Sequence, residues 1–332
     1  MSASPRSPSP MEEEPLDALV ERVREHPSVQ DKRSIHRAYD EPLGETVSFE
    51  HPFFPEATAG DVKIGDDCAA LPDGHGDHLL FASEGIVPAF VQAHPWFAGY
   101  SAVMVNLSDI CAMGGRPLAV TDMLWVKDRA DGQDVWSGMT AAADAYGVPV
   151  VGGHTSYRCD DKHLGVAVLG QAGPLLTSYE AQPGEVLLMA VDLNGAYFGD
   201  DPFWNTSTDA TPERLRALLP LMHEVAAQGW SRAAKDISMG GVVGTLAMLL
   251  HTSAVGATLR LDDVPRPPGV PWSKWLVSFP SFGFLLTASL GNARPIRAHF
   301  HAHDVACEAV GRILPEKEGL RVTRQGEQAQ IL

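Results

Sequence analysis

One apolar segment, Trp96 to Leu118 (WFAGYSAVMVNLSDICAMGGRPL), carries a carboxylate and an amide inside a run that otherwise predicts a buried helix. At 3.6 residues per turn, Asn106 and Asp109 lie one turn apart on the same face, and Gly114-Gly115 predicts the end of the helix. A buried acid is costly unless it has a partner, so this face meets either a hydrogen-bonding partner in the core or a ligand in a cleft. The segment alone leaves both interpretations open, and the other acidic positions have to decide between them.

The size and charge of the chain limit what it does. At 332 residues it is long for one hydrophobic core and suits two domains of about 150 residues each. No apolar run approaches the roughly 18 residues that a membrane-spanning helix needs, so we expect no membrane insertion. The formal net charge of −17 repels phosphate backbones, so no nucleic-acid partner is expected, and an anionic substrate requires a metal ion or local Lys and Arg residues.

Cysteine usage and the first residues bear on the location of the protein. The four cysteines are widely spaced and form no CxxC pair, which argues against a disulfide scaffold and a structural zinc site and favours a reducing cytoplasm. Residues 1–15 contain Ser and Pro but lack the apolar core of a signal peptide, so we expect a disordered tail there.

A second acidic feature is the pair Asp66-Asp67, which lies in the setting Gly-Asp-Asp-x-Ala-Ala where a predicted strand bends. Adjacent carboxylates repel each other unless a cation neutralises them, and Mg²⁺ prefers oxygen ligands. Other Asp-Asp pairs in the chain lack this setting and suit solvated turns. Glu84 ends the next predicted strand and is a further candidate ligand.

Two glycine pairs follow predicted strands. The stretch Gly152-Gly153-His154-Thr155 predicts a tight turn after the strand 148–151, or a place where a ligand approaches the backbone; a hydrogen-bonded loop histidine is the alternative. Gly240-Gly241 follows Asp236 and opens an apolar helix. The N-terminus of that helix can receive a phosphate while Asp236 holds a metal ion, or the glycines can serve close packing alone.

Basic and histidine-rich positions are weaker candidates. Lys32 and Arg33 form a local basic pair in an acidic protein, which suits either a phosphate contact or a solvated turn. His299, His301 and His303 lie at the end of a predicted helix. Helical spacing puts only the first and third on one face and no cysteine completes a ligand set, so we expect a surface helix end without a metal.

Four motifs occur in order over about residues 60–332: Gly65-Asp66-Asp67-x-Ala-Ala, Asn106-x-x-Asp109-Ile-x-Ala-Met-Gly-Gly, Gly152-Gly153-His154-Thr155 and Lys-Asp236-Ile-Ser-x-Gly240-Gly241. Together they resemble the superfamily of aminoimidazole ribonucleotide (AIR) synthetase, selenophosphate synthetase, thiamine-monophosphate kinase and the hydrogenase maturation dehydratase. The resemblance implies an α/β (α+β) fold of two AIR synthase-like domains, over residues 16–172 and 173–332. It further implies that the first domain pairs across a homodimer to form a shared barrel, and that Mg·ATP lies in the cleft.

The resemblance also implies roles for individual residues. Asp67, Asp109 and Asp236 resemble the magnesium-coordinating carboxylates of the family, and we add Asp66 and Glu84 as further candidate ligands. The candidate nucleotide-binding residues are Lys32, Arg33, Asn106, Gly152, Gly153, His154, Thr155, Gly240 and Gly241.

Departures from the family pattern leave the acceptor open. Glu84 stands where an Asp usually follows the second strand, and no cysteine precedes Cys68, although selenophosphate synthetase needs a Cys or selenocysteine in its N-terminal segment. Because the chain contains neither a Walker A sequence nor G-x-G-x-x-G, nucleotide binding rests on the acidic cluster.

We therefore expect an ATP-dependent, Mg²⁺-requiring kinase or synthetase that acts on a small molecule, with thiamine-monophosphate kinase as the nearest named case. One alternative is a selenophosphate synthetase-like enzyme without the N-terminal Cys. The other is a catalytically silent paralogue that binds a nucleotide or a protein partner.

Overall fold

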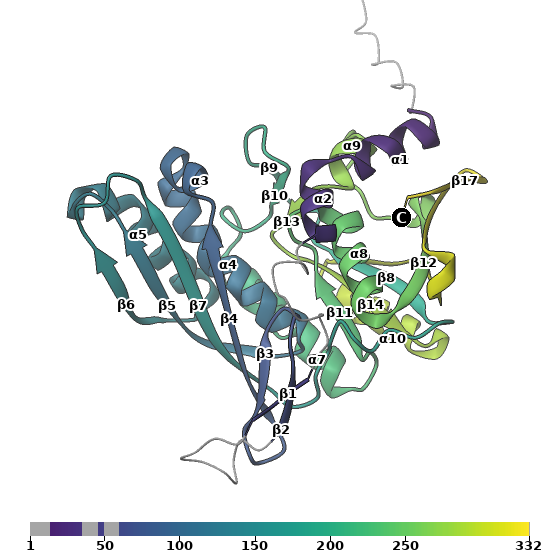
Figure 1. The fold of residues 1–332 in the computed structure, drawn as a ribbon, viewed down its shortest axis with the longest axis horizontal. Coiled ribbons are helices and arrows are strands. Elements are labelled where there is room, and N and C mark those ends of the chain that lie inside the picture. Colours follow the sequence, from purple (N-terminus) through teal and green to yellow (C-terminus); the bar gives the residue numbers. More distant parts are fainter. Residues whose placement is uncertain (1–13, 35–45, 50–59, 332) are drawn as a thin grey trace, which may run out of the picture.

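The computed structural model describes residues 14–34, 46–49 and 60–331, so most of the expected tail over residues 1–15 lies outside the described residues. Two α/β bodies stand side by side, one built on a five-stranded sheet and the other on a seven-stranded sheet (Figure 1). The expected mixed α/β fold with two domains is confirmed.

The N-terminal sheet has the strand order β3-β4-β7-β5-β6, in which only the pair β5 and β6 is parallel. In chain order its strands are β3 (Ala69–Pro72), β4 (His78–Ile86), β5 (Arg116–Trp125), β6 (Val150–Ser156) and β7 (His163–Ala172). One face is covered by helices α3 (Pro88–Ala93), α4 (Pro95–Ala112) and α5 (Arg129–Tyr146). α4 and α5 pack closely because Gly99 and Gly138 lack side chains: a Cβ on Gly138 would lie 1.9 Å from the Trp96 carbonyl oxygen.

The opposite face of this sheet is open in the single chain. Large apolar side chains stay exposed on it, including Phe81 on β4, which is 51% exposed, and Val151 on β6, which is 63% exposed. The others on these strands are Leu79, Leu118, Met123, Trp125 and Leu169. Within the described residues the sheet does not close on itself, so one chain alone does not form the barrel that the resemblance implied.

The C-terminal sheet has the order β11-β14-β8-β15-β12-β16-β17. In chain order its strands are β8 (Val186–Val191), β11 (Ala233–Asp236), β12 (Val255–Arg260), β14 (Gly283–Ala288), β15 (Ala306–Pro315), β16 (Leu320–Arg324) and β17 (Glu327–Gln330). Central strand β8 is buried on both faces. One face packs against α8 (Gly241–Ser253), and the other packs against α7 (Leu221–Ala227) and α10 (Leu290–His301).

Smaller elements complete the chain. They are the paired strands β1 (Thr46–Phe49) and β2 (Gly60–Lys63), the small sheet of β9 (Ala196–Tyr197), β10 (Phe203–Asn205) and β13 (Phe279–Pro280), and helices α6 (Pro212–Leu218) and α9 (Trp272–Trp275). In the described part of the chain, single 3₁₀ turns span Leu261–Asp263 and Glu316–Glu318.

Two N-terminal helices, α1 (Leu16–Arg24) and α2 (Pro27–Ser34), pack on the C-terminal body beside α9 and α8 (Figure 1). α1 buries its apolar stripe in the same core as α8: Leu16, Leu19, Val20 and Val23. Residues 16–34 were expected in the N-terminal domain (16–172), whereas their packing joins them to the C-terminal one. An apolar stripe predicts that a helix is buried, but it does not predict which surface covers it.

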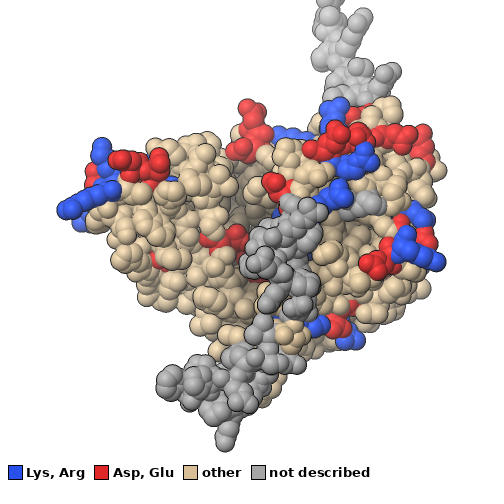
Figure 2. All heavy atoms as spheres, viewed as in Figure 1, with Lys and Arg blue, Asp and Glu red and all other residues tan. Residues whose placement is uncertain are grey.

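Among the described residues, no helix is both long and apolar enough to cross a membrane, and all four cysteines are free. On the face seen in Figure 2, Lys and Arg side chains are interspersed with Asp and Glu.

Candidate metal centre

Three carboxylates converge at the junction of the two domains. Asp67 lies in the bend between β2 and β3, Asp109 lies on α4, and Asp236 ends β11. One carboxylate oxygen from each lies within 4.8 Å of the others. The first two residues come from the N-terminal body and the third from the C-terminal body, so the cluster exists only when the two bodies pack together.

Burial and mutual repulsion both act on these acids. Burial, followed by the charge of Asp236, raises the pKa of Asp109 well above its ordinary value. Burial, followed by the charge of Asp67, raises the pKa of Asp236 to about 7. Among the described residues, no hydrogen-bond donor reaches the buried Oδ2 of Asp67. Mutual repulsion of the acids favours a bound cation, and Asp67 Oδ2 is a ligand atom without a partner among the described residues.

Lys235, which was not among the predicted site residues, lies beside this cluster. Its ammonium forms an ion pair with Asp67 Oδ1, lies 4.0 Å from Asp66 Oδ1, and is almost fully buried at 4% exposure. Burial acts to lower the pKa of Lys235, but the charges of Asp67 and Asp66 outweigh burial and raise it. What marks Lys235 is its burial in strand β11, because buried charges are rare unless paired, and no local sequence pattern carries that signal.

Asp66 has a supporting position. Its Oδ2 accepts a hydrogen bond of 2.8 Å from the Ser178 backbone N–H, and its Oδ1 accepts one of 3.0 Å from the Asp67 backbone N–H. It is not among the three acids whose oxygens converge. Asp66 therefore fixes the bend that presents Asp67, and the structure does not group it with the convergent ligands as the sequence analysis had.

Glu84 and Asn106 border the centre. Glu84, on β4, is exposed and interacts electrostatically with Lys32 and Asp67. Asn106, one turn before Asp109 on α4, donates from Nδ2 to the Ala102 carbonyl oxygen at 2.7 Å. Its buried Oδ1 receives no hydrogen bond from the described residues.

Helix α2 crosses the N-terminus of α8. A Cβ on Gly240 would lie 3.0 Å from the Ser28 carbonyl oxygen and 3.2 Å from Lys32 Cγ, so the glycine allows this crossing. Gly241 has φ +61°, and a Cβ there would lie 2.5 Å from the Leu276 carbonyl oxygen. Both glycines thus have a packing reason, which was the alternative to a phosphate site.

The same crossing brings Lys32 within electrostatic reach of Asp236 as well as of Glu84. Its neighbour Arg33 is exposed. Of the basic pair singled out from the sequence, only Lys32 is thus placed toward the centre.

The stretch Gly152 to Thr155 does not form the expected turn. It lies inside β6, because pairing with β5 continues to Ser156. β6 is the edge strand, separated from β4 by β5 and β7, so within one chain His154 stands apart from the acidic cluster. A Cβ on Gly153 would lie 2.0 Å from the carboxylate of Asp122, an acid that is 2% exposed and that the sequence analysis missed.

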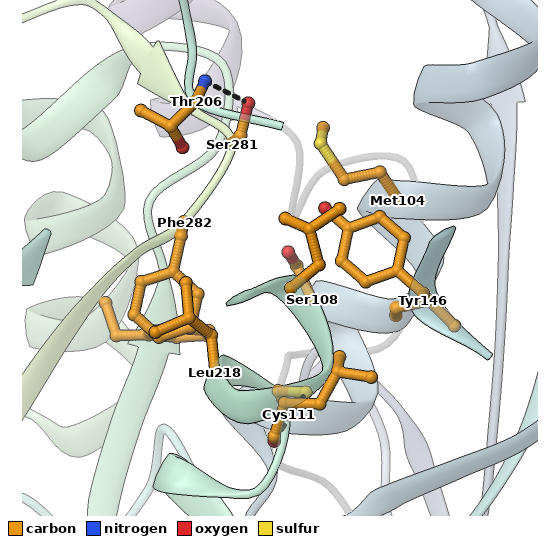
Figure 3. Close-up of a pocket in the computed structure, with 12 residues that line it drawn as sticks. Met104, Ser108, Cys111, Tyr146, Thr206, Leu218, Ser281 and Phe282 are labelled. Atoms are coloured by element: carbon orange, nitrogen blue, oxygen red, sulfur yellow. Dashed lines mark hydrogen bonds between the residues drawn. The ribbon is translucent and has the colours of Figure 1, made fainter. Parts of the chain in front are cut away.

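Two cavities lie near the domain junction. A space of about 20 Å³ between α4 and the C-terminal body is lined by Met104, Cys111 and Phe282, with Thr206 and Ser281 joined by a hydrogen bond at its edge (Figure 3). It has the size of one water molecule, so it cannot hold a nucleotide. A larger cavity of about 330 Å³ adjoins the centre through Asp66 and is lined also by Tyr179 and Arg232.

Comparison with known proteins supports the architecture and the resemblance drawn from the motifs. Residues 65–172 match the family model for the AIR synthase related protein, N-terminal domain, and residues 191–323 match the model for its C-terminal domain. The chain is 44% identical to the protein sll0787 of Synechocystis sp. over 255 residues, which are 76% of this chain and 79% of that protein. It is 31% identical to MJ0640 of Methanocaldococcus jannaschii over 274 residues, 82% of this chain and 84% of that protein. Neither name states an activity.

Solved structures share the fold. PurL of T. maritima complexed with ATP has a TM-score of 0.68 at 20% identity, over 95% of this chain and 53% of that chain. AaThiL complexed with AMPPCP and TMP has a TM-score of 0.61 at 20% identity, over 80% of this chain and 89% of that chain. At these identities the likeness establishes the fold alone.

Proposed function

Because the chain belongs to the family of AIR synthase related proteins, we propose that it is a Mg²⁺-dependent enzyme that uses ATP to phosphorylate or activate a small molecule. The observation that carries the proposal is the convergence of Asp67, Asp109 and Asp236 from both domains. ATP and AMPPCP are the nucleotides named in the two structural neighbours, PurL and ThiL.

The residues at the centre fit Mg²⁺. Asp67, Asp109 and Asp236 offer only hard oxygen donors, and Asp67 Oδ2 is buried without a partner among the described residues. A bound Mg²⁺ would supply positive charge for phosphate oxygens. The acids themselves would orient that charge from both domains, so that a nucleotide held at the centre bridges the cleft.

Lys32 is the residue that we assign to the phosphates of the nucleotide. It approaches the centre from α2, where it interacts electrostatically with Asp236 and Glu84. A lysine ammonium binds phosphate as a point charge, and here it adds attraction for an anion beside acids that would otherwise repel it. Asn106, whose Oδ1 accepts no hydrogen bond from the described residues and which lies one turn from Asp109, is assigned to the same site.

We also propose that the enzyme is a homodimer formed through the N-terminal sheet. Exposed apolar side chains on one face of that sheet are costly in water unless a second surface covers them. β6 is moreover an edge strand whose backbone groups can pair with another chain. The stretch Gly152 to Thr155 would then lie at the interface. His154 of one chain could there contact a nucleotide bound to the other chain, although it stands apart from the acidic cluster of its own chain.

Acceptor-dependent turnover of ATP tests the proposed activity. Purified protein is incubated with Mg·ATP and candidate small-molecule acceptors, and ADP and AMP are quantified by chromatography, with Asp109→Asn as the inactive control. Acceptor-dependent release of ADP or AMP in the wild type alone is the expected result. Mg²⁺-dependent ATP binding without release for any acceptor would favour the catalytically silent paralogue, and neither binding nor release would contradict both.

A further inference from the structure

The acidic centre already contains one cation of its own. The Lys235 ammonium lies between the carboxylates of Asp66 and Asp67, with an ion pair to Asp67 Oδ1 and a separation of 4.0 Å from Asp66 Oδ1. All three side chains are at most 6% exposed: Lys235, Asp66 and Asp67. Because little solvent reaches this ammonium, the neighbouring carboxylates are what stabilise its charge.

The two oxygens of Asp67 differ in their interactions. Oδ1 is taken by Lys235, whereas buried Oδ2 has no hydrogen-bond partner in the described part of the chain. Asp67 also provides one of the oxygens that converge with those of Asp109 and Asp236. One oxygen of Asp67 is therefore paired with the ammonium next to Asp66, and the other is buried without a partner among the described residues, in a carboxylate that converges with those of Asp109 and Asp236.

Electrostatics opposes a second metal ion between Asp66 and Asp67. A divalent ion bridging Asp66 and Asp67 would share both carboxylates with the ammonium, and like charges at such separations repel strongly in a buried site. Each oxygen of Asp66 also accepts one backbone hydrogen bond, so an ion there would share those oxygens with the Ser178 and Asp67 N–H groups as well as with the ammonium.

We propose that Lys235 is a built-in cation that fills the Asp66–Asp67 side of the centre, so that the protein alone binds a single divalent metal ion, at Asp67, Asp109 and Asp236. The inference rests on the proposed function in that the centre binds a metal. Lys235 is then a positioning residue that fixes both the number of ions and the orientation of Asp67. Any further ion in the working enzyme has to arrive with the phosphates of the nucleotide.

The test counts bound ions without nucleotide. Mn²⁺ is titrated into the metal-free protein, and free Mn²⁺ is measured by electron paramagnetic resonance. Asp236→Asn serves as the matched control, because it keeps the surface acids that bind Mn²⁺ non-specifically. We expect one Mn²⁺ per wild-type chain beyond the Asp236→Asn control, one for Lys235→Arg, and two for Lys235→Met, in which the ammonium is gone.

Each outcome decides something. Two or more specific ions in the wild type, or a single ion in a folded Lys235→Met, would overturn the role of Lys235 while leaving the metal centre intact. No specific ion in the wild type would instead remove the metal centre and the proposed function with it.

Folding of Lys235→Met is checked by circular dichroism, because that variant leaves Asp67 without its ion pair. The double variant Asp66→Asn with Lys235→Met keeps the net charge and removes the second carboxylate, so it is expected to bind one ion. If the single variant does not fold, the wild-type and double-variant counts decide, since two ions in either contradict the proposal.

Discussion

The side chain on which the proposed metal centre depends most directly is Asp109, an acid buried on α4 and surrounded by other acids. Asp109→Asn keeps the shape of the side chain and removes its charge. We predict that it weakens Mg·ATP binding by about tenfold or more, because a charged ligand to the ion is lost, while the fold is kept. Isothermal titration calorimetry with and without Mg²⁺ measures the effect. Equal affinity of the wild type for ATP in both conditions would exclude a metal-dependent site.

The raised pKa of Asp236 predicts a pH dependence of stability in the metal-free protein. Burial and then the charge of Asp67 bring this pKa to about 7. In the unfolded chain an aspartate has a pKa of about 3.9. Between these pH values the folded state holds a proton that the unfolded state has released. The contribution of Asp236 to stability is therefore fully lost as pH rises from about 4 to about 7, and it changes little above that range.

Thermal denaturation in a chelator measures this contribution. We expect the melting temperature of the wild type to fall more steeply than that of Asp236→Asn over that range. The corresponding difference in unfolding free energy is on the order of a few kcal/mol. Excess Mg²⁺ should flatten the wild-type profile, because the ion replaces the proton. Parallel profiles for wild type and Asp236→Asn would mean that Asp236 titrates normally.

The site residues that could be predicted from the sequence are those that stand in recognisable motifs. Asp67, Asp109 and Asp236 stand in motifs, and the structure brings them together although they lie far apart in the chain. Lys235 and Asp122 could not be assigned roles, because what marks them is burial and the identity of their neighbours. Those properties arise from strand pairing and domain packing, which no local pattern of residues contains.

At the scale of elements, helix α2 reaches the centre through Lys32, which interacts electrostatically with Asp236 and Glu84. We predict that Lys32→Ala lowers the affinity for Mg·ATP by about tenfold, as expected for one lost charge-assisted phosphate contact. Lys32 has no role in the buried core, so the melting temperature of the free protein should change little. Arg33→Ala, at the exposed neighbour, is the control. Equal losses of affinity in both variants would point to a general effect of net charge.

Element boundaries were predicted well at two of the glycine pairs and poorly at the third, Gly152-Gly153. The buried helix expected within Trp96 to Leu118 occurs as α4 and ends just before Gly114 and Gly115, as predicted. The Gly152 to Thr155 stretch was expected to end a strand, but glycines also occur within strands where a neighbour needs space, and here the carboxylate of Asp122 fills it. The histidines near the end of α10 have protein partners: His299 lies 3.3 Å from the Leu221 carbonyl oxygen, and His301 lies 3.3 Å from Glu308 Oε1.

At the scale of the whole molecule, the open face of the N-terminal sheet predicts self-association. Phe81→Glu places a charge at an exposed apolar position of that face. We expect the wild type to have twice the mass of one chain by light scattering at micromolar concentration, and the variant to have the mass of one chain, because a charge buried in an apolar interface is costly. Leu290→Glu, which changes an exposed leucine on α10, is the matched control and should remain dimeric. A monomeric wild type would contradict the proposed dimer.

The packing of the two bodies against each other supports a last prediction, because Asp236 is the one acid of the cluster that comes from the C-terminal body. A nucleotide whose metal ion contacts Asp67, Asp109 and Asp236 ties the bodies together, so its binding should stabilise the whole chain. A ligand at 100 times its dissociation constant adds about 2.7 kcal/mol to the state that binds it, which gives a clear rise in melting temperature. We predict that Mg·ATP produces this rise in the wild type and that Asp236→Ala loses most of it. In the absence of ligand, Asp236→Ala should melt at or slightly above the wild-type temperature at pH 8, since removing a buried acid relieves repulsion from Asp67. A full ATP-induced rise in Asp236→Ala would mean that the N-terminal body binds the nucleotide alone and that Asp236 contributes only to the packing of the two domains.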